Sequence, residues 1–372
     1  MSTLLDLDRK ILELLKQRTQ YSVSEYDYQT TVLQDQLKLA EDFKLNPTYV
    51  TNLFKIINDE TVRVFEQKSL EQKNNLWCQK YRKASYLGPV GTYSYQAMTK
   101  YCEQYQIKPE EISCSNFHDL VSNVKQGISD LAFLPVENTS SGIINDVYDL
   151  LHDHGVHIVG EITLQIKHSI LVNDPSDAAA IDTFYSHPQP IIQCSNFLKL
   201  HYPNAKFVYC DSTADAIKKV KNLNTPNIAA IASEFGGKLF GLTPIRSNIA
   251  NQSQNFTRFI VIAREPITVP TGLASKISIT FTTNNTPGAL AAVLDIFKQH
   301  RFNMTKLASR PIIGRPWEEL FYADFIANLE TVDAQNAIHE LKQLCHLNIL
   351  GCYPLEKEQQ ELKGTSGNGS EN

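Results

Sequence analysis

Short apolar segments alternate with helical stretches from residue 84 to about residue 263, and this alternation constrains the fold more than any other feature of the chain. The clearest strand-like segments are 133–134, 156–159, 170–172, 207–209 and 228–231. Strands that alternate with helices are typical of α/β domains, so we predict mostly parallel sheets in this region. The length of the region suggests two lobes.

The N-terminal segment has a different composition. Residues 4–82 contain no glycine and one proline, Pro47. One face of a helix is indicated by four apolar residues three or four positions apart, Leu4, Leu7, Ile11 and Leu14. A second helix is predicted over 28–43 and a third from about Pro47. We therefore predict an all-α module over residues 1–82.

A connector over 264–272, with two prolines and a glycine, separates the α/β region from a small C-terminal domain. A helix is expected to open with Thr286 as its cap and Pro287 in its first turn. The other predicted elements are strands near 277–281, 304–307 and 320–325, a helix over 334–344 and a strand at 347–352. This βαββαβ order is that of a ferredoxin-like α+β domain, which we place at 274–355. The polar residues 357–372 are predicted to be disordered.

Charge and cysteine content exclude several classes of partner. The net charge is -5 with 20% charged residues, so the chain has no broad basic field for nucleic acid or anionic lipid. The seven cysteines are scattered without a Cys-x-x-Cys pair, which argues against a zinc ribbon or a disulfide framework. The N-terminus has no export signal, and no stretch is long and apolar enough to span a membrane. We expect a cytoplasmic protein without metal.

Four polar segments in the α/β region carry the candidate chemistry: 88–94, 135–142, 185–190 and 255–259. The first three precede helices, where free backbone N–H groups and hydroxyls can bind a carboxylate without a metal. In the last, a hydroxyl and a guanidinium are adjacent at Thr257 and Arg258, a pair suited to an anionic substrate with a leaving hydroxyl. We expect the three loops before helices to face one cleft, and the alternative for each is an ordinary capped helix start.

Two other features are given structural interpretations. His152, His154 and His157 are interpreted as loop histidines where a helix gives way to a strand, not as metal ligands. Cys194, which we place on the helix after Gln193, is interpreted as a small buried side chain because no activating base is near it in the sequence.

The four segments, in this order, resemble the signature segments of the prephenate dehydratases. They read Gly-Pro-Val-Gly-Thr-Tyr-Ser at 88–94, Pro-Val-Glu-Asn-Thr-Ser-Ser-Gly at 135–142, Ser-His-Pro-Gln at 186–189 and Asn-Phe-Thr-Arg-Phe at 255–259. The resemblance implies two periplasmic-binding-protein-like lobes at 84–263 that convert prephenate to phenylpyruvate, with loss of water and CO2 and without a cofactor. The product lies on the route to phenylalanine.

The resemblance also implies site residues. Thr257 matches the essential threonine of the family, and an alkyl hydroxyl there acts as a hydrogen-bond donor to the departing hydroxyl. Glu137 is the first candidate for a carboxyl partner and Asp211 the second, although Glu137 also suits a helix start. Candidate substrate contacts are Asn138, Thr139, Ser140, Ser186, Gln193 and Thr213. Arg258 either binds a substrate carboxylate or forms a structural ion pair, because strict strand alternation would turn it away from Thr257.

The flanking domains resemble two further families. The small domain is similar to ACT regulatory domains through Gly288, Ala289 and Leu290 and through Ser309, Arg310 and Pro311, although Ala308 stands where the family usually has glutamate. This implies inhibition by L-phenylalanine and a homodimer or higher homo-oligomer.

The N-terminal module resembles a helical chorismate mutase domain, in which Arg18 matches one arginine. Met1, Gln29 and Val64 replace an arginine, a lysine and a glutamine of the family. Because that reaction needs an electrostatic clamp, we expect a degenerate mutase domain. A working bifunctional enzyme and a carboxylate-binding protein without catalysis are the alternatives.

Overall fold

The computed structural model describes residues 2–18, 38, 40–57, 80–152, 155–176, 180–284, 286–312 and 318–356. The chain divides into two compact units, Met1–Trp77 and Cys78–Asn372. In the first unit, α1 spans Ser2–Arg18 and residues 47–57 are helical, as predicted. The helix predicted over 28–43 lies mostly outside the described residues, as do Met1, Gln29 and Val64.

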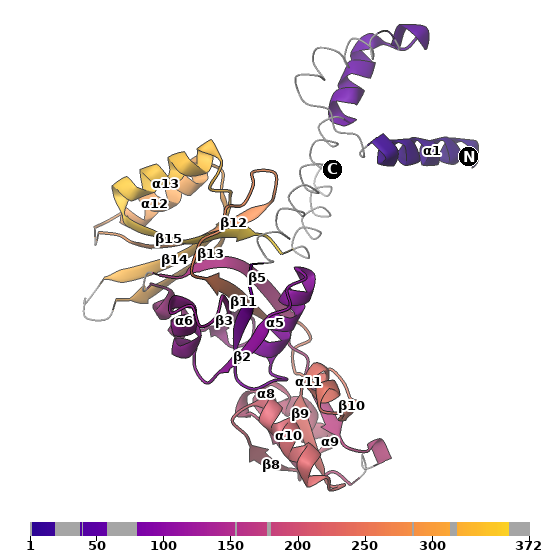
Figure 1. Ribbon diagram of the computed structural model, residues 1–372, viewed down its shortest axis with the longest axis vertical. Coiled ribbons are helices and arrows are strands. Elements are labelled where there is room, and N and C mark those ends of the chain that lie inside the picture. Colours follow the sequence, from indigo (N-terminus) through magenta and orange to yellow (C-terminus); the bar gives the residue numbers. More distant parts are fainter. Residues whose placement is uncertain are drawn as a thin grey trace. The chain divides into compact units, whose positions relative to one another are not determined.

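The second unit contains three sheets (Figure 1). The first forms lobe 1, with strands in the order β2-β1-β3-β11-β5 and with β4 paired to β3. Its strands are β1 (Lys83–Leu87), β2 (Glu110–Cys114), β3 (Leu131–Asn138), β4 (Gly142–Ile143), β5 (His157–Gln165) and β11 (Phe256–Ala263). Its helices are α5 (Tyr93–Gln104), α6 (Phe117–Lys125) and α7 (Asn145–His152). Successive residues of β3 point to opposite faces, so Phe133 packs on Tyr101 of α5 while Leu134 joins the core shared with α6 and α7.

The second sheet forms lobe 2, in the order β10-β6-β9-β7-β8. Its strands are β6 (Ser169–Val172), β7 (Thr183–Ser186), β8 (Lys206–Tyr209), β9 (Ile228–Ala232) and β10 (Thr243–Arg246). Its helices are α8 (Pro188–Gln193), α9 (Ser195–His201), α10 (Thr213–Leu223) and α11 (Glu234–Leu239). Two separate apolar cores lie on the two faces of this sheet, one with Leu198 of α9 and one with Ile217 of α10.

The predicted strands are present, but the prediction of mostly parallel sheets is wrong. Strand β1 is parallel to β2 and β3, and β7 is parallel to β8 and β9, whereas β11 is antiparallel to β3 and β5, and β6 is antiparallel to β9 and β10. The chain leaves lobe 1 after β5 and returns to it as β11, so the returning strand enters the sheet in the opposite direction. An apolar run of a buried strand carries no information about that direction.

The third sheet confirms the ferredoxin-like prediction, with antiparallel strands in the order β13-β14-β12-β15. Its elements are β12 (Ser275–Thr282), α12 (Ala289–Gln299), β13 (Asn303–Pro311), β14 (Glu319–Ile326), α13 (Val332–Leu344) and β15 (His346–Pro354). The predicted cap of its first helix is wrong, because the N-cap of α12 is Gly288 and no side chain caps the helix. Gly288 has a φ of 83°, a left-handed conformation that glycine adopts without steric cost.

The third sheet packs against lobe 1. Leu320, Tyr322 and Leu350 of this sheet belong to the same apolar core as Leu134 of β3. At Gly351 of β15, an added Cβ atom would lie 2.1 Å from the carbonyl oxygen of Ile158 in β5. The backbones of β15 and β5 therefore approach so closely that only glycine fits at this position. No described helix is long and apolar enough to cross a membrane.

Candidate active site

A cleft of about 840 Å³ lies between the two lobes. Lobe 1 contributes the loop before α5, the end of β3, the start of α7 and Thr257 of β11. Lobe 2 contributes the start of α8 and the first residues of α10. The four polar segments singled out in the sequence therefore line one cleft, although they are far apart in the chain.

The hydroxyl of Thr257 is held in this cleft by Asn138. Because β3 and β11 pair with Thr257 opposite Asn138, both side chains point to the cleft. Nδ2 of Asn138 donates to Oγ1 of Thr257 at 2.9 Å and to Oδ1 of Asn255 at 2.7 Å. Oδ1 of Asn138 accepts from the backbone N–H groups of Ser140 and Ser141, both at 2.9 Å, which fixes the orientation of the amide.

The hydrogen of the Thr257 hydroxyl has no acceptor among the described residues. Its oxygen already accepts from Asn138, and Thr257 is 8% exposed with its exposed part in the cleft. A hydroxyl has one hydrogen to donate, so that hydrogen is available to a bound molecule.

The predicted site residues divide into two groups. Asn138, Gln193, Thr213 and Thr257 line the cleft, and so does Asp211, the second candidate carboxyl partner. Glu137, Thr139, Ser140, Ser186 and Arg258 do not line it. Gln193 ends α8, and Cys194 lies between α8 and α9 rather than on the helix predicted for it. Burial raises the pKa of the Cys194 thiol to about 12, which agrees with its interpretation as an inert side chain.

Glu137 does not meet Thr257, and the prediction that it is the carboxyl partner of Thr257 is wrong. Glu137 and Arg258 form the next pair of the ladder, so both side chains point to the opposite face of the sheet. Nε of Arg258 lies 2.6 Å from Oε1 of Glu137, and Lys306 of β13 contacts the other carboxylate oxygen. Burial alone would raise the pKa of Glu137, but Arg258 and Lys306 more than offset it and the pKa is lowered.

Arg258 forms structural ion pairs, the second of its two predicted roles. Its Nη1 lies 2.8 Å from Oδ2 of Asp324 in β14 and 3.2 Å from Oε2 of Glu161 in β5. Nζ of Lys276 in β12 lies 2.7 Å from Oε1 of Glu161. The side chains of Arg258, Glu161, Lys276 and Asp324 are each less than a tenth exposed. With Lys306 and Glu137, three cations balance three carboxylates between lobe 1 and the third sheet.

Three other predicted contacts also have structural partners outside the cleft. Oγ of Ser186 is buried and donates to the carbonyl of Ile231 at 2.7 Å. Oγ1 of Thr139 accepts from the N–H of Phe256 at 2.9 Å, which ties the end of β3 to the start of β11. Oγ of Ser140 donates to Oε1 of Gln252 at 2.6 Å. Thr139 and Ser140 lie in the turn between β3 and β4, Ser186 is the last residue of β7, and none of the three lines the cleft.

His168 is a cleft residue that the sequence analysis missed. It lies in the crossing from β5 to β6, is 1% exposed and has its Nε2 2.7 Å from Oε1 of Gln193. Its Nδ1 lies 3.2 Å from the hydroxyl of Tyr93. Because an amide oxygen can only accept, the proton of the neutral ring is on Nε2. Burial lowers the pKa of His168.

This burial predicts a pH dependence of stability. In the unfolded chain His168 takes up a proton below its ordinary pKa of 6.5, whereas the folded protein resists protonation until a lower pH. The free energy of unfolding should therefore fall as the pH drops below about 6.5, and His168→Gln should reduce that fall. Urea unfolding of both proteins between about pH 7.5 and pH 5 measures how the free energy of unfolding depends on pH. His201→Gln, at an exposed histidine, is the matched control and should keep the wild-type slope.

Metal ligation is not suggested by the described part of the chain, where no group of three or more His, Cys, Asp or Glu side chains is placed to hold an ion. Residues 153 and 154 lie outside that part, so the predicted loop role of His154 is untested. Three aspartates line the cleft, at 146, 211 and 215. Within the described residues, no lysine or arginine lines it.

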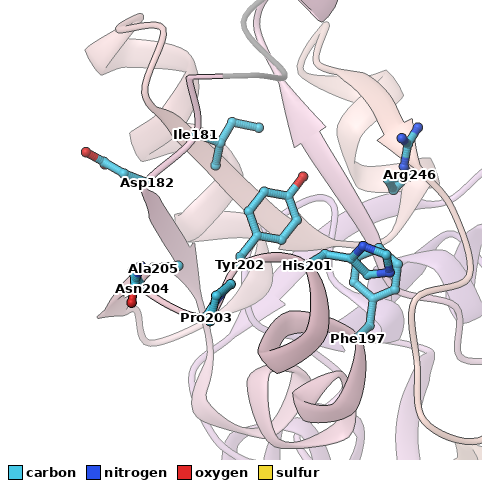
Figure 2. A pocket seen from close by; sticks show the side chains of 9 residues that line it. All are labelled: Ile181, Asp182, Phe197, His201, Tyr202, Pro203, Asn204, Ala205 and Arg246. Atoms are coloured by element: carbon cyan, nitrogen blue, oxygen red, sulfur yellow. The ribbon is translucent and has the colours of Figure 1, made fainter.

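Two further pockets lie elsewhere. One of about 430 Å³ in lobe 2 is lined by α9 and the segment after it, with Asp182 and Arg246 on opposite sides (Figure 2), and it shares no residue with the cleft. The other, of about 360 Å³, is in the third sheet and is lined by the predicted effector residues Gly288, Ala289 and Leu290. The predicted effector residues Ser309, Arg310 and Pro311 do not line it, but they pair in register with Phe321, Leu320 and Glu319 of β14.

The sequence model of the prephenate dehydratase family matches residues 84–267. The bifunctional chorismate mutase/prephenate dehydratase of Enterobacter agglomerans is 41% identical over 365 residues, covering 94% of this chain and 94% of that protein.

Two solved structures share the fold of the second unit. GqqA, described as a novel type of quorum quenching acylase, is 28% identical with a TM-score of 0.66, covering 75% of this chain and 100% of that chain. The prephenate dehydratase of Arthrobacter aurescens in complex with L-Phe is 23% identical with a TM-score of 0.66, covering 73% of this chain and 90% of that chain. The second likeness concerns the fold alone.

Proposed function

The chain belongs to the prephenate dehydratase family, and we propose that the cleft around Thr257 is where it converts prephenate to phenylpyruvate. The ring hydroxyl leaves as water and the ring carboxylate as CO2, so the dianion takes up one proton overall. Aromatisation drives the reaction, and the protein has to bind the dianion and assist departure of the hydroxyl. We assign residues 84–263 to this activity.

The observation that carries the proposal is the free hydrogen of the Thr257 hydroxyl. Asn138 occupies a lone pair of Oγ1 at 2.9 Å, so the O–H group is directed to a different partner. A donor fixed before the substrate arrives costs no reorganisation when charge develops on the leaving oxygen. Thr257 therefore donates a hydrogen bond to the departing hydroxyl.

Asp211 replaces Glu137 as the proposed carboxyl partner. It follows β8 at the start of the loop that leads into α10, and it lines the same cleft as Thr257. A carboxyl group is a suitable source for the proton that turns the departing hydroxide into water. Turnover of prephenate by Asp211→Asn tests this role, and a rate equal to wild type would exclude it.

We assign residues 274–355 to an ACT domain that binds L-phenylalanine. In its pocket, α12 has no side-chain cap, so the N–H groups of Leu290 and Ala291 in its first turn suit a carboxylate. Oε2 of Glu319 is buried without a hydrogen-bond partner and suits an ammonium group. Leu290 and Phe321 supply apolar surface for the side chain. Arg258, which is adjacent to Thr257, is paired with Asp324 of the same domain.

Glu319→Gln should weaken inhibition by L-phenylalanine by about tenfold to a hundredfold, because a hydrogen bond to a charged group contributes about 1.5–3 kcal/mol. The rate without effector should be unchanged. Initial rates of prephenate turnover across a phenylalanine titration measure both quantities. Glu318→Gln at the neighbouring position is the matched control, and an unchanged inhibition constant for Glu319→Gln would place the ammonium elsewhere.

We propose that the helical module of residues 1–82 is a degenerate mutase domain that supports a homo-oligomer. Leu7, Ile11 and Leu14 of α1 are each more than half exposed, which is unusual for an apolar stripe and fits a surface that another chain covers. The E. agglomerans relative is named for both activities, so conversion of chorismate is the test of this proposal. The described cysteines are all free, which fits a cytoplasmic location.

A further inference from the structure

The cleft has a deficit of positive charge for its proposed substrate. Three aspartates line it, and the described lining residues include no lysine or arginine. A dianion that enters such a cleft needs another source of positive potential. The N-terminus of a helix is one such source, because its first N–H groups lack partners and the peptide dipoles add up there.

Four helices begin at the cleft, and two of them, α5 in lobe 1 and α10 in lobe 2, begin next to each other and have a side-chain cap. The cap of each occupies only the third N–H group: Oγ1 of Thr92 accepts from Tyr95 N at 3.3 Å, and Oγ of Ser212 accepts from Asp215 N at 3.0 Å. The N–H groups of the first two residues of each helix have no partner within the described part of the chain. Each helix thus presents two free donors.

The two N-termini lie next to each other across the lobe boundary. Gly91, in the loop before α5, has a φ of 96°, and a Cβ atom added to it would lie 3.7 Å from the methyl group of Ala214 in α10. A Cβ atom added to Gly236 of α11 would lie 2.7 Å from the carbonyl oxygen of Gly91. Like ends of two helix dipoles therefore meet, an arrangement that a bound anion stabilises.

A second observation points to a ligand at the same place. Ser94 is 7% exposed and Thr213 is 9% exposed, and both line the cleft within the first two residues of their helices. Neither hydroxyl has a hydrogen-bond partner among the described residues, although Ser94 and Thr213 as whole residues are more than nine-tenths buried. Both hydroxyls are therefore free to donate to a group bound in the cleft.

We propose, on the basis of the dehydratase function above, that the pyruvyl carboxylate of prephenate binds between the N-termini of α5 and α10 and accepts hydrogen bonds from Ser94 and Thr213. The pyruvyl carboxylate keeps its charge from substrate to product. The ring carboxylate instead becomes CO2, and strong stabilisation of its charge before reaction would raise the barrier. The site therefore binds the retained carboxylate equally well in the substrate and in the transition state. The ring carboxylate occupies a part of the cleft without such donors.

The test compares two ligands with Ser94→Ala and Thr213→Ala. Phenylpyruvate retains only the pyruvyl carboxylate, so its competitive inhibition constant reports on this site alone. Each substitution should raise the KM for prephenate and the inhibition constant of phenylpyruvate by the same factor, about tenfold, because each removes one hydrogen bond to a charged group. The kcat should remain within about threefold of wild type, because the lost hydrogen bond stabilises the bound substrate and the transition state equally.

Ser115→Ala is the matched control, since Ser115 lines the same cleft but its hydroxyl donates to Asp119 at 3.1 Å. A higher KM with an unchanged phenylpyruvate constant would place the ring carboxylate at the helix ends and overturn the proposal. Unchanged values of both constants would overturn it as well. Turnover of prephenate by the wild-type chain in the same assay tests the dehydratase function separately. If the chain does not turn over prephenate, calorimetric titration with phenylpyruvate still measures the effect of each substitution on the dissociation constant at the carboxylate site.

Discussion

Thr257→Val should lower the kcat for prephenate by about a hundredfold to a thousandfold, the usual effect of removing one fixed donor from a developing negative charge. Valine keeps the shape of threonine and removes the only hydrogen that Thr257 can donate in the cleft. Thr257→Ser keeps that hydrogen and should retain most of the activity. The KM should change little in both variants, since the interaction strengthens in the transition state. Steady-state formation of phenylpyruvate measures these values.

Two controls separate catalysis from folding in this series. Thr257→Val leaves Nδ2 of Asn138 without one acceptor, so urea unfolding must show that the variant is folded under assay conditions. Ser140→Ala removes a hydroxyl two residues from Asn138 that bonds to Gln252 outside the cleft, and it should leave kcat unchanged. A folded Thr257→Val enzyme with near wild-type kcat would contradict the assigned role of the hydroxyl.

Glu161→Gln should lower the free energy of unfolding by about 3–5 kcal/mol, because it leaves the buried ammonium group of Lys276 without its counterion. Lys276 is 3% exposed, and Glu161 is the one partner that its ammonium group has among the described residues. Arg258 loses one of its three carboxylates at the same time. Urea unfolding followed by circular dichroism measures the change.

The exposed pair Lys298–Asp295 provides the comparison for this prediction. Its side chains are 85% and 64% exposed, so Asp295→Asn should change the free energy of unfolding by less than about 0.5 kcal/mol. If Glu161→Gln costs no more than Asp295→Asn, the six charges between lobe 1 and the third sheet do not hold the two together.

Much of the fold was predictable because its signals are local. The period-two pattern at Ile277 and the helical spacing at 334–344 specify the third sheet and its second helix, and both are present. The direction of β11 was not predictable in the same way. Val261 and Ile262 are buried whichever way the strand runs, so only the tertiary arrangement decides between parallel and antiparallel pairing.

The site was predictable where residue type and strand period agree. Thr257 and Asn138 share a rung of the ladder and face the cleft. The same alternation turns Arg258 and Glu137 to the other face, a consequence that depends on β11 beginning before Thr257, at Phe256. His168 lay outside the candidate segments, and Ser94 lay in one of them without an assigned role, because their roles depend on burial and, for His168, on the contact with Gln193.

Dehydratase activity is tested most directly by formation of phenylpyruvate by the purified chain given prephenate, with chorismate alone in a parallel reaction. We expect rapid phenylpyruvate formation from prephenate and none above the spontaneous rate from chorismate. Formation from chorismate would show that the helical module is a working mutase. Failure to convert prephenate above its spontaneous rate, by a folded chain, would contradict the assignment of the cleft.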